Sequence, residues 1–212
     1  GGNSHYQDTE LRQKTLAEQQ ILYLGVGISG GESGSRHGPS MMPGGSRKAY
    51  QRIQPIFEAI SAQVEGEPCV TYLGPKAAGH YVKMVHNGIE YGMMQAFAEG
   101  FEMLQAKQEM QLDLQQISAI WQHGSVVRSW LLDLIADAFA DDPQLSTLSD
   151  YVDDSGEGRW TVQDSIDLAV PTPVLTLALQ MRFRSRQDDA FAGKVLNAMR
   201  AGFGGHTVKT ND

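Results

Sequence analysis

The sequence predicts a small α/β part over roughly the first 75 residues, followed by an all-helical part built around one long helix. Two short apolar runs, each closed by a glycine, lie before Pro75 and are typical of buried strands. Beyond Pro75, apolar residues recur at the three- and four-residue spacing of helices, for longest over 76–108. We therefore expect two domains, over 1–75 and 76–212.

The expected α/β part begins with a helix and a strand. Residues 8–20 mix charged and polar side chains with a few apolar ones, which is typical of a surface helix. The apolar run 21–24, closed by Gly25, predicts a buried strand. Residues 25–45 contain eight glycines and two prolines, so we expect a loop there.

A second helix should begin after Ser46, whose side chain can cap it, and Pro55 should kink or restart that helix. Residues 69–73 predict a second short strand, closed by Gly74. The helices expected beyond Pro75 cover 76–108, 112–121, 125–140, 162–168, 173–186 and 188–199. The three tryptophans, Trp121, Trp130 and Trp160, are expected to anchor the core.

The segment from Gly25 to Gly30 matches the G-x-G-x-x-G pattern of dinucleotide-binding proteins. That pattern also needs a helix to open at its third glycine, so that the helix N-terminus faces the pyrophosphate. Residues 31–39 are rich in glycine and serine and are not expected to start one, so we reject this interpretation. Two alternatives stay open: a loop whose backbone N–H groups approach a small anion, or a flexible connector.

Composition excludes several classes of function. The chain has 212 residues and a formal net charge of −8, which argues against a nucleic-acid binder or a protein bound to anionic membranes. Its one cysteine, Cys69, allows no intrachain disulfide, and no apolar run approaches the roughly 20 residues of a membrane span. The histidines show no metal-ligand spacing with Cys69, so we expect no metal site. A single cysteine fits a reducing compartment, so we expect a cytoplasmic protein.

The most informative stretch lies within the long helix. Lys83, His86, Asn87 and Glu90 are spaced i, i+3, i+4 and i+7, so they share one face, with Tyr91 at its edge. A solvated polar face would also tolerate these residues. However, histidine and asparagine are poor helix formers, and a glycine beside them, at position 88, costs about 1 kcal/mol within a helix. The pattern therefore indicates a requirement other than helix stability.

Four segments resemble the family of decarboxylating 6-phosphogluconate dehydrogenases: 1–4, 29–32, 38–45 and 79–91. The resemblance extends from Gly1 to about residue 209, and its ending is similar to the short forms of the family. It implies a mixed α/β remnant of a Rossmann-like domain, followed by an all-α helical domain with a long central helix. It also implies that most of the nucleotide-binding domain, including the main motif for NAD or NADP, is absent from the chain.

The resemblance implies an oxidoreductase that converts 6-phosphogluconate to ribulose 5-phosphate and CO₂ with NAD or NADP, as in the pentose phosphate pathway and gluconate utilisation. Lys83 would be the general base that accepts the C3 hydroxyl proton while hydride leaves C3. The protonated Lys83 would then polarise the keto oxygen during loss of CO₂. Glu90 would be the acid that protonates C1 of the enediol.

The resemblance also implies a set of binding residues. Six would hold the sugar acid: Asn3, Ser29, Gly30, Gly31, His86 and Asn87. Asn3 would also contact the cofactor, and Tyr91 and Arg182 would bind the phosphate. Arg200 and His206, on the tail, would reach into the site of a partner subunit. Such tail exchange implies a homodimer or a larger homo-oligomer.

One position departs from the family pattern, since Ser155 stands where the family usually has a phosphate-binding lysine. On a helix, Arg182 and Arg186 would share a face and could clamp an anion, although a basic surface patch explains the same run. Two further interpretations remain. A noncatalytic helical oligomerisation or ligand-binding fragment would let Lys83 and Glu90 vary freely, and another β-hydroxyacid dehydrogenase would not need the Arg182 phosphate contact.

Overall fold

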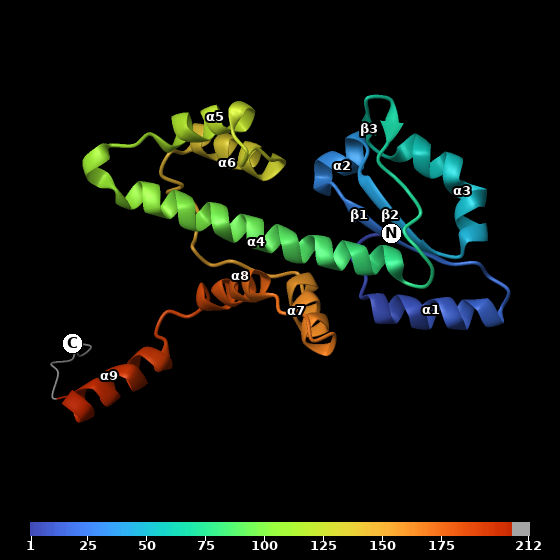
Figure 1. Ribbon diagram of the computed structural model, residues 1–212. Coiled ribbons are helices and arrows are strands. Elements are labelled where there is room, and N and C mark those ends of the chain that lie inside the picture. Colours follow the sequence, from blue (N-terminus) through green and yellow to red (C-terminus); the bar gives the residue numbers. More distant parts are fainter. Residues whose placement is uncertain (205–212) are drawn as a thin grey trace.

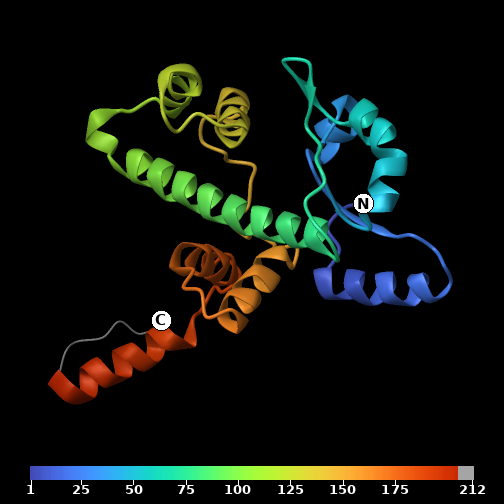
Figure 2. The ribbon, with the colours of Figure 1, turned by 45° about the vertical axis from the view of Figure 1, so that its right-hand side comes forward.

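The computed structural model describes residues 1–204, and one helix of 29 residues, α4 (Ala78–Ala106), runs through its middle (Figure 1). The α/β part lies at the N-terminal end of α4. Helices α5 (Leu114–Gly124) and α6 (Trp130–Asp141) lie beside its C-terminal half, and α7 (Glu157–Asp167) and α8 (Pro173–Arg184) lie on the opposite side (Figure 2). The expected order of a small α/β part and a helical part with a long central helix is confirmed.

The α/β part contains few and short strands. Its elements are α1 (Tyr6–Glu18), β1 (Leu24–Ser29), α2 (Gly31–His37), β2 (Ser40–Gly45), α3 (Arg47–Ile60), β3 (Gln63–Val64) and β4 (Glu67–Pro68). Strands β1 and β2 pair antiparallel, from Leu24 opposite Gly45 to Ser29 opposite Ser40. Isolated parallel bridges extend this sheet on both sides, from Gly2 to Gly27 and from Met41 to Val70.

The expected buried strand at 21–24 is wrong, because Ile21 and Leu22 are 49% and 45% exposed and the strand begins only at Leu24. The expected loop at 25–45 is also wrong, since it holds β1, α2 and β2. Glycine serves close packing in β1: a Cβ on Gly27 would lie 2.4 Å from Cβ of Lys83 on α4. The high glycine content therefore reflects a strand pressed against a helix.

A helix does follow the glycine motif, contrary to expectation. The N–H of Gly34 donates to the carbonyl of Gly30 at 2.7 Å, and this turn opens the seven-residue α2. Gly30 and Gly31 make the bend at φ values of 151° and 57°, which favour glycine. The first two glycines of the motif, at 25 and 27, lie within β1, so they do not form the turn of a dinucleotide fingerprint.

Three other expectations in the α/β part have mixed outcomes. The Ser46 side chain accepts a hydrogen bond from the Ala49 N–H at 3.2 Å, which confirms the predicted cap. Helix α3 continues through Pro55 without a restart. The segment 69–73 pairs with β2 only through isolated bridges, although the Met41 N–H donates to the Cys69 carbonyl at 2.9 Å.

The later helices, of which α9 (Phe191–Gly204) is the last, match the expected ones within a few residues at each end. Longer differences occur at the starts of α6 and α7 and at the end of α9. A cluster of Phe101, Leu132 and Phe139 joins α4 to α6, and Trp121 packs against it from α5. A second cluster of Tyr91, Ala178 and Leu179 joins α4 to α8. Within residues 1–204, no helix is both long and apolar enough to cross a membrane.

Asp164, on α7, links this helix to α1 and to the N-terminal part of α4. Its two carboxylate oxygens each accept a hydrogen bond at 2.7 Å, one from the Tyr6 hydroxyl on α1 and one from the Tyr81 hydroxyl on α4. The hydrogen bond to Asp164, together with burial and the negative charge of this carboxylate, raises the pKa of Tyr81 to about 12.

Asp164→Asn is therefore expected to lower the free energy of unfolding by about 1–3 kcal/mol, because hydrogen bonds to a charged acceptor are lost. The pKa of Tyr81 should fall toward its ordinary value of about 10. Urea unfolding and spectrophotometric titration of the tyrosines measure the two effects. Asp167→Asn, on the exposed face of the same helix, is the control and should change neither. Equal unfolding free energies and equal tyrosine titrations in the two variants would contradict the proposed role of Asp164 in joining the three helices.

Candidate functional site

A cleft of about 960 Å³ lies where the β1–α2 turn meets the first half of α4. The N-terminal segment and the start of α6 complete its walls. Eight of the sequence-predicted site residues line it: Asn3, Ser29, Gly30, Gly31, Lys83, His86, Asn87 and Glu90. The fold thus brings the polar face of α4 and the glycine turn together, although they are far apart in the sequence.

The polar side chains of α4 are linked by short contacts. The Lys83 ammonium donates to Oδ1 of Asn87, and its Nζ lies 3.5 Å from Nδ1 of His86. Nδ1 of His86 is 3.0 Å from Oδ1 of Asn87 and 3.9 Å from a carboxylate oxygen of Glu90. Across the cleft, Oγ of Ser29 is 3.3 Å from Nε2 of His86. An amine, an imidazole, an amide and a carboxylate therefore converge on one side of the cleft.

Lys83 is the most enclosed of these groups. It is 5% exposed, and burial lowers the pKa of its ammonium, whereas the charges of Glu90 and Glu157 act in the opposite direction. A lowered pKa favours the neutral amine, the form that can accept a proton near neutral pH. The α4 face therefore carries a group suited to general base chemistry, with the Glu90 carboxyl two turns further along the helix as a possible acid.

The predicted phosphate residues Tyr91 and Arg182 lie together, but outside the lining of this cleft. The Arg182 guanidinium lies 3.6 Å from the centroid of the Tyr91 ring and donates to the Asp153 carbonyl at 2.6 Å. The Tyr91 hydroxyl accepts a hydrogen bond from the Ser155 N–H at 3.0 Å. Ser155, which stands where the family usually has a phosphate-binding lysine, therefore lies beside Tyr91, one of the two predicted phosphate residues.

The expectation that Arg182 and Arg186 share a helical face is wrong, because α8 ends at Arg184. Arg186 instead forms an ion pair with Asp154 at 2.7 Å, and Arg159 pairs with the same carboxylate at 2.7 Å. The two guanidinium groups hold the pKa of Asp154 down at about 2. Arg186 is thus engaged by a carboxylate of the same chain, which it shares with Arg159.

The structure does not bring Arg200 to the cleft. Arg200 is exposed on α9, which projects away from α4 in both views (Figures 1 and 2). His206, the other predicted tail residue, lies outside the described residues.

Of the three tryptophans, Trp130 is 54% exposed and lines the cleft, so it is not a core anchor. Trp160 packs against His5 with ring centroids 4.7 Å apart.

Glu157 is a residue near the site that the sequence pattern did not single out. It is 1% exposed at the first turn of α7, and burial raises the pKa of its carboxyl, with Lys83 acting against that rise. The one signal in the sequence was a glutamate between two glycines, at 156 and 158, shortly before a tryptophan. Its significance depends on the contact between α7 and α4, which the sequence pattern does not reveal.

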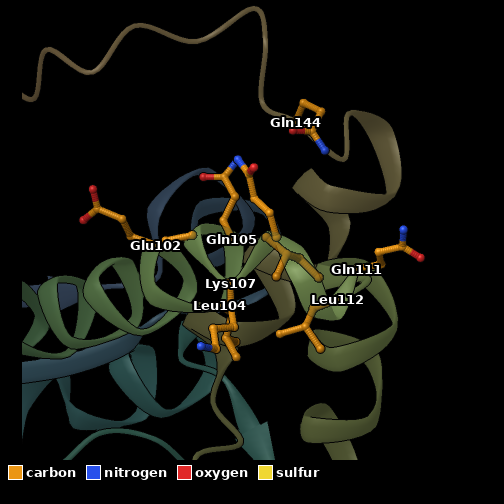
Figure 3. A pocket seen from close by; sticks show the side chains of 10 residues that line it. Glu102, Leu104, Gln105, Lys107, Gln111, Leu112 and Gln144 are labelled. Carbon is orange, nitrogen blue, oxygen red and sulfur yellow. The ribbon is translucent and has the colours of Figure 1, made fainter.

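A second hollow lies at the far end of α4 and has about 450 Å³. Its side chains come from the end of α4, the segment after it and the loop after α6 (Figure 3). They are mainly amides and exposed charges, and Lys107 is already paired with Glu109 at 2.6 Å. Among residues 1–204, no group of three or more histidine, cysteine or acidic side chains is placed to hold a metal ion. The first cleft is therefore the better candidate.

Sequence models of two domains match the chain. The model of the 6-phosphogluconate dehydrogenase C-terminal domain matches residues 79–192, and the model of the NAD binding domain of 6-phosphogluconate dehydrogenase matches residues 1–74. The putative 6-phosphogluconate dehydrogenase YqeC of Bacillus subtilis is 44% identical over 208 residues, which cover 98% of this chain and 68% of that protein. The NAD(+)-dependent, decarboxylating enzyme of Haloferax volcanii is 41% identical, with 100% of this chain and 69% of that protein covered.

A solved structure shows the same fold. The 6-phosphogluconate dehydrogenase of Plasmodium falciparum superposes with a TM-score of 0.81 at 35% identity, covering 100% of this chain and 46% of that one. A 3-hydroxyisobutyrate dehydrogenase of Salmonella typhimurium, at 19% identity and a TM-score of 0.68, shares the fold alone. The chain thus spans about two thirds of the shorter relatives and less than half of the longer one.

Proposed function

Since the chain belongs to the 6-phosphogluconate dehydrogenase family, a family of oxidoreductases, we propose that it supplies the site at which 6-phosphogluconate is oxidised and decarboxylated. The observation that carries this proposal is the convergence of Lys83, His86 and Glu90 on the glycine turn in one cleft. We also propose the division into residues 1–75 and 76–212, a cytoplasmic location and a place in the pentose phosphate pathway.

In the proposed reaction, Lys83 acts first as a base and then as an acid. Its neutral amine accepts the proton of the C3 hydroxyl while hydride leaves C3, which gives a β-keto acid and a protonated Lys83. The new ammonium then polarises the C3 keto oxygen, so that the carbon–carbon bond to the carboxylate breaks and CO₂ leaves. The resulting enediol receives a proton at C1 from Glu90, which yields ribulose 5-phosphate.

The other cleft residues would hold the substrate. Ser29, with the backbone of Gly30 and Gly31, would contact the sugar acid from one side, and His86 and Asn87 would contact it from α4. Tyr91 and Arg182 would bind the phosphate. The stacking of the guanidinium on the ring, 3.6 Å from its centroid, supports a shared role for the two residues. In a homo-oligomer, Arg200 and His206 of a partner's tail would complete the site.

The family implies NAD or NADP as the hydride acceptor. The residues present fit the nicotinamide end of this cofactor but not its diphosphate. Ile28 and Val82 give the cleft an apolar wall beside Lys83, and Asn3 lies nearby, so a flat nicotinamide ring has a surface to lie on. For the diphosphate, residues 1–204 provide no glycine fingerprint, because Gly25 and Gly27 lie inside β1 against α4. When bound, the nicotinamide supplies the acceptor for the C3 hydride.

Turnover of 6-phosphogluconate labelled with ¹⁴C at C1 tests the proposal, with NAD and NADP supplied in turn. We expect reduced nucleotide, followed at 340 nm, and labelled CO₂ in equal amounts. Reduced nucleotide without CO₂ would contradict decarboxylation and favour another β-hydroxyacid dehydrogenase. If neither product forms, the proposed turnover is wrong for this chain, and a noncatalytic ligand-binding or oligomerisation fragment is favoured.

A further inference from the structure

Glu157 is an unusual residue to find fully enclosed. It is 1% exposed, and both of its carboxylate oxygens are buried without a hydrogen-bond partner among the described residues. A buried carboxyl group without partners is costly, and most buried polar groups in proteins are satisfied. The stability of the fold alone therefore gives no reason for a glutamate at this position.

The packing of α7 explains where the carboxyl lies. A Cβ on Gly158 would be 2.6 Å from Cε2 of Tyr91, so the first turn of α7 touches α4 there. One turn later, Thr161 Oγ1 donates to the carbonyl of Met84 at 2.9 Å, and Thr161 Cγ2 would lie 2.7 Å from a Cβ on Gly88. The first turns of α7, with the buried Glu157, therefore pack against the part of α4 from Met84 to Tyr91, which directly follows Lys83.

We propose that Glu157 is a positioning residue for Lys83, the buried counter-charge that stabilises the ammonium formed when Lys83 accepts the substrate proton. The inference rests on the proposed function, because the proton that Lys83 accepts comes from the substrate. The electrostatic interaction between Glu157 and Lys83 is also present without substrate. Both groups are at least 95% buried, where a lone charge is costly and an opposite charge offsets that cost.

Other titratable groups also lie near Lys83, and their effects must be distinguished from that of Glu157. On its own helix these are Glu90 and the imidazole of His86, 3.5 Å away, and the neutral Asn87 accepts its hydrogen bond. From the strand side the neighbour is Gly27, which has no side chain. Glu157 is thus the acidic group that a different helix brings near Lys83. Its oxygens do not hydrogen-bond to Lys83, so its charge acts from a distance and in the same direction as that of Glu90.

The test is an NMR titration of the substrate-free chain labelled with ¹³C at Cε of lysine. The Lys83 resonance is assigned as the one missing from Lys83→Met. In Glu157→Gln, we expect the titration midpoint of Lys83 to fall by about one pH unit. Burial disfavours the charged ammonium of Lys83, and this variant lacks the carboxylate whose charge offsets that effect. Glu102→Gln, on the same helix as Lys83 but exposed, is the matched control and should leave the midpoint unchanged.

A Lys83 midpoint in Glu157→Gln that stays within about 0.2 pH units of the parent chain would overturn the proposal, whatever the variant's stability. If that variant does not fold, the reciprocal measurement decides. In Lys83→Met, labelled at Cδ of glutamate, the midpoint of Glu157 should rise, and an unchanged midpoint would overturn the pairing. Neither readout depends on turnover, so failure of the proposed reaction and failure of this inference are distinguishable.

Discussion

Replacing Gly79 by alanine is expected to destabilise the chain strongly. A Cβ at this position would lie 2.1 Å from the carbonyl oxygen of Met42 and 2.3 Å from that of Gly25. Both contacts are with backbone atoms of the β1–β2 pair, so no side-chain rotation relieves them. The sheet would have to separate from α4, and we expect a loss of about 3 kcal/mol or more in the free energy of unfolding.

Gly100→Ala is the matched control for this substitution, because Gly100 lies in the same helix and a Cβ there would meet no atom within 4 Å. Alanine at that position should stabilise the chain by up to about 1 kcal/mol through helix propensity. Urea unfolding of both variants measures the difference. Similar stabilities for the two would contradict the close approach of the sheet to α4, and with it the placement of the glycine turn in the cleft.

Lys83→Met is expected to lower kcat for 6-phosphogluconate by about 10²–10⁴-fold, the usual contribution of a general base. Methionine keeps most of the length of the side chain and introduces no buried charge, so the fold should persist. Steady-state formation of reduced nucleotide measures the loss, with circular dichroism as the check on folding. Lys107→Met, at the exposed end of α4, is the control and should keep kcat within about twofold.

Retention of kcat in Lys83→Met would contradict the assignment of the base. Glu90→Gln separates the second step from the first, because an amide cannot deliver the proton to C1. If Glu90 has that role, its substitution should slow formation of ribulose 5-phosphate. An unchanged rate would leave Glu90 only as a charge beside His86, from which it is 3.9 Å away.

Helical periodicity predicted most of the helical part, because α4 buries one continuous stripe against its neighbours. The glycine-rich segment was mispredicted for a tertiary reason. Gly27 lies in a strand, where local preference would not place it, since α4 leaves no room for a Cβ. Similarly, the apolar Ile21 and Leu22 are exposed, although the pattern predicts a buried strand.

The candidate site was predictable to the extent that it lies on one helix. The spacing of Lys83, His86, Asn87 and Glu90 places them on one face without knowledge of the fold. Glu157 could not be assigned in this way, because its place behind Lys83 depends on how α7 packs against α4. The pairing of Arg186 with Asp154 likewise depends on where α8 ends, which sequence patterns locate only within a few residues.

Calorimetric titration of the chain with 6-phosphogluconate decides whether the cleft, together with the neighbouring Tyr91 and Arg182, is a substrate site. We expect saturable binding, weakened at least about tenfold in Arg182→Ala and with gluconate in place of 6-phosphogluconate, because both changes remove the phosphate contact. Arg184→Ala, on the last turn of the same helix, should bind as the parent chain does. Absence of binding, or equal affinity for gluconate, would contradict a phosphorylated sugar acid as the ligand.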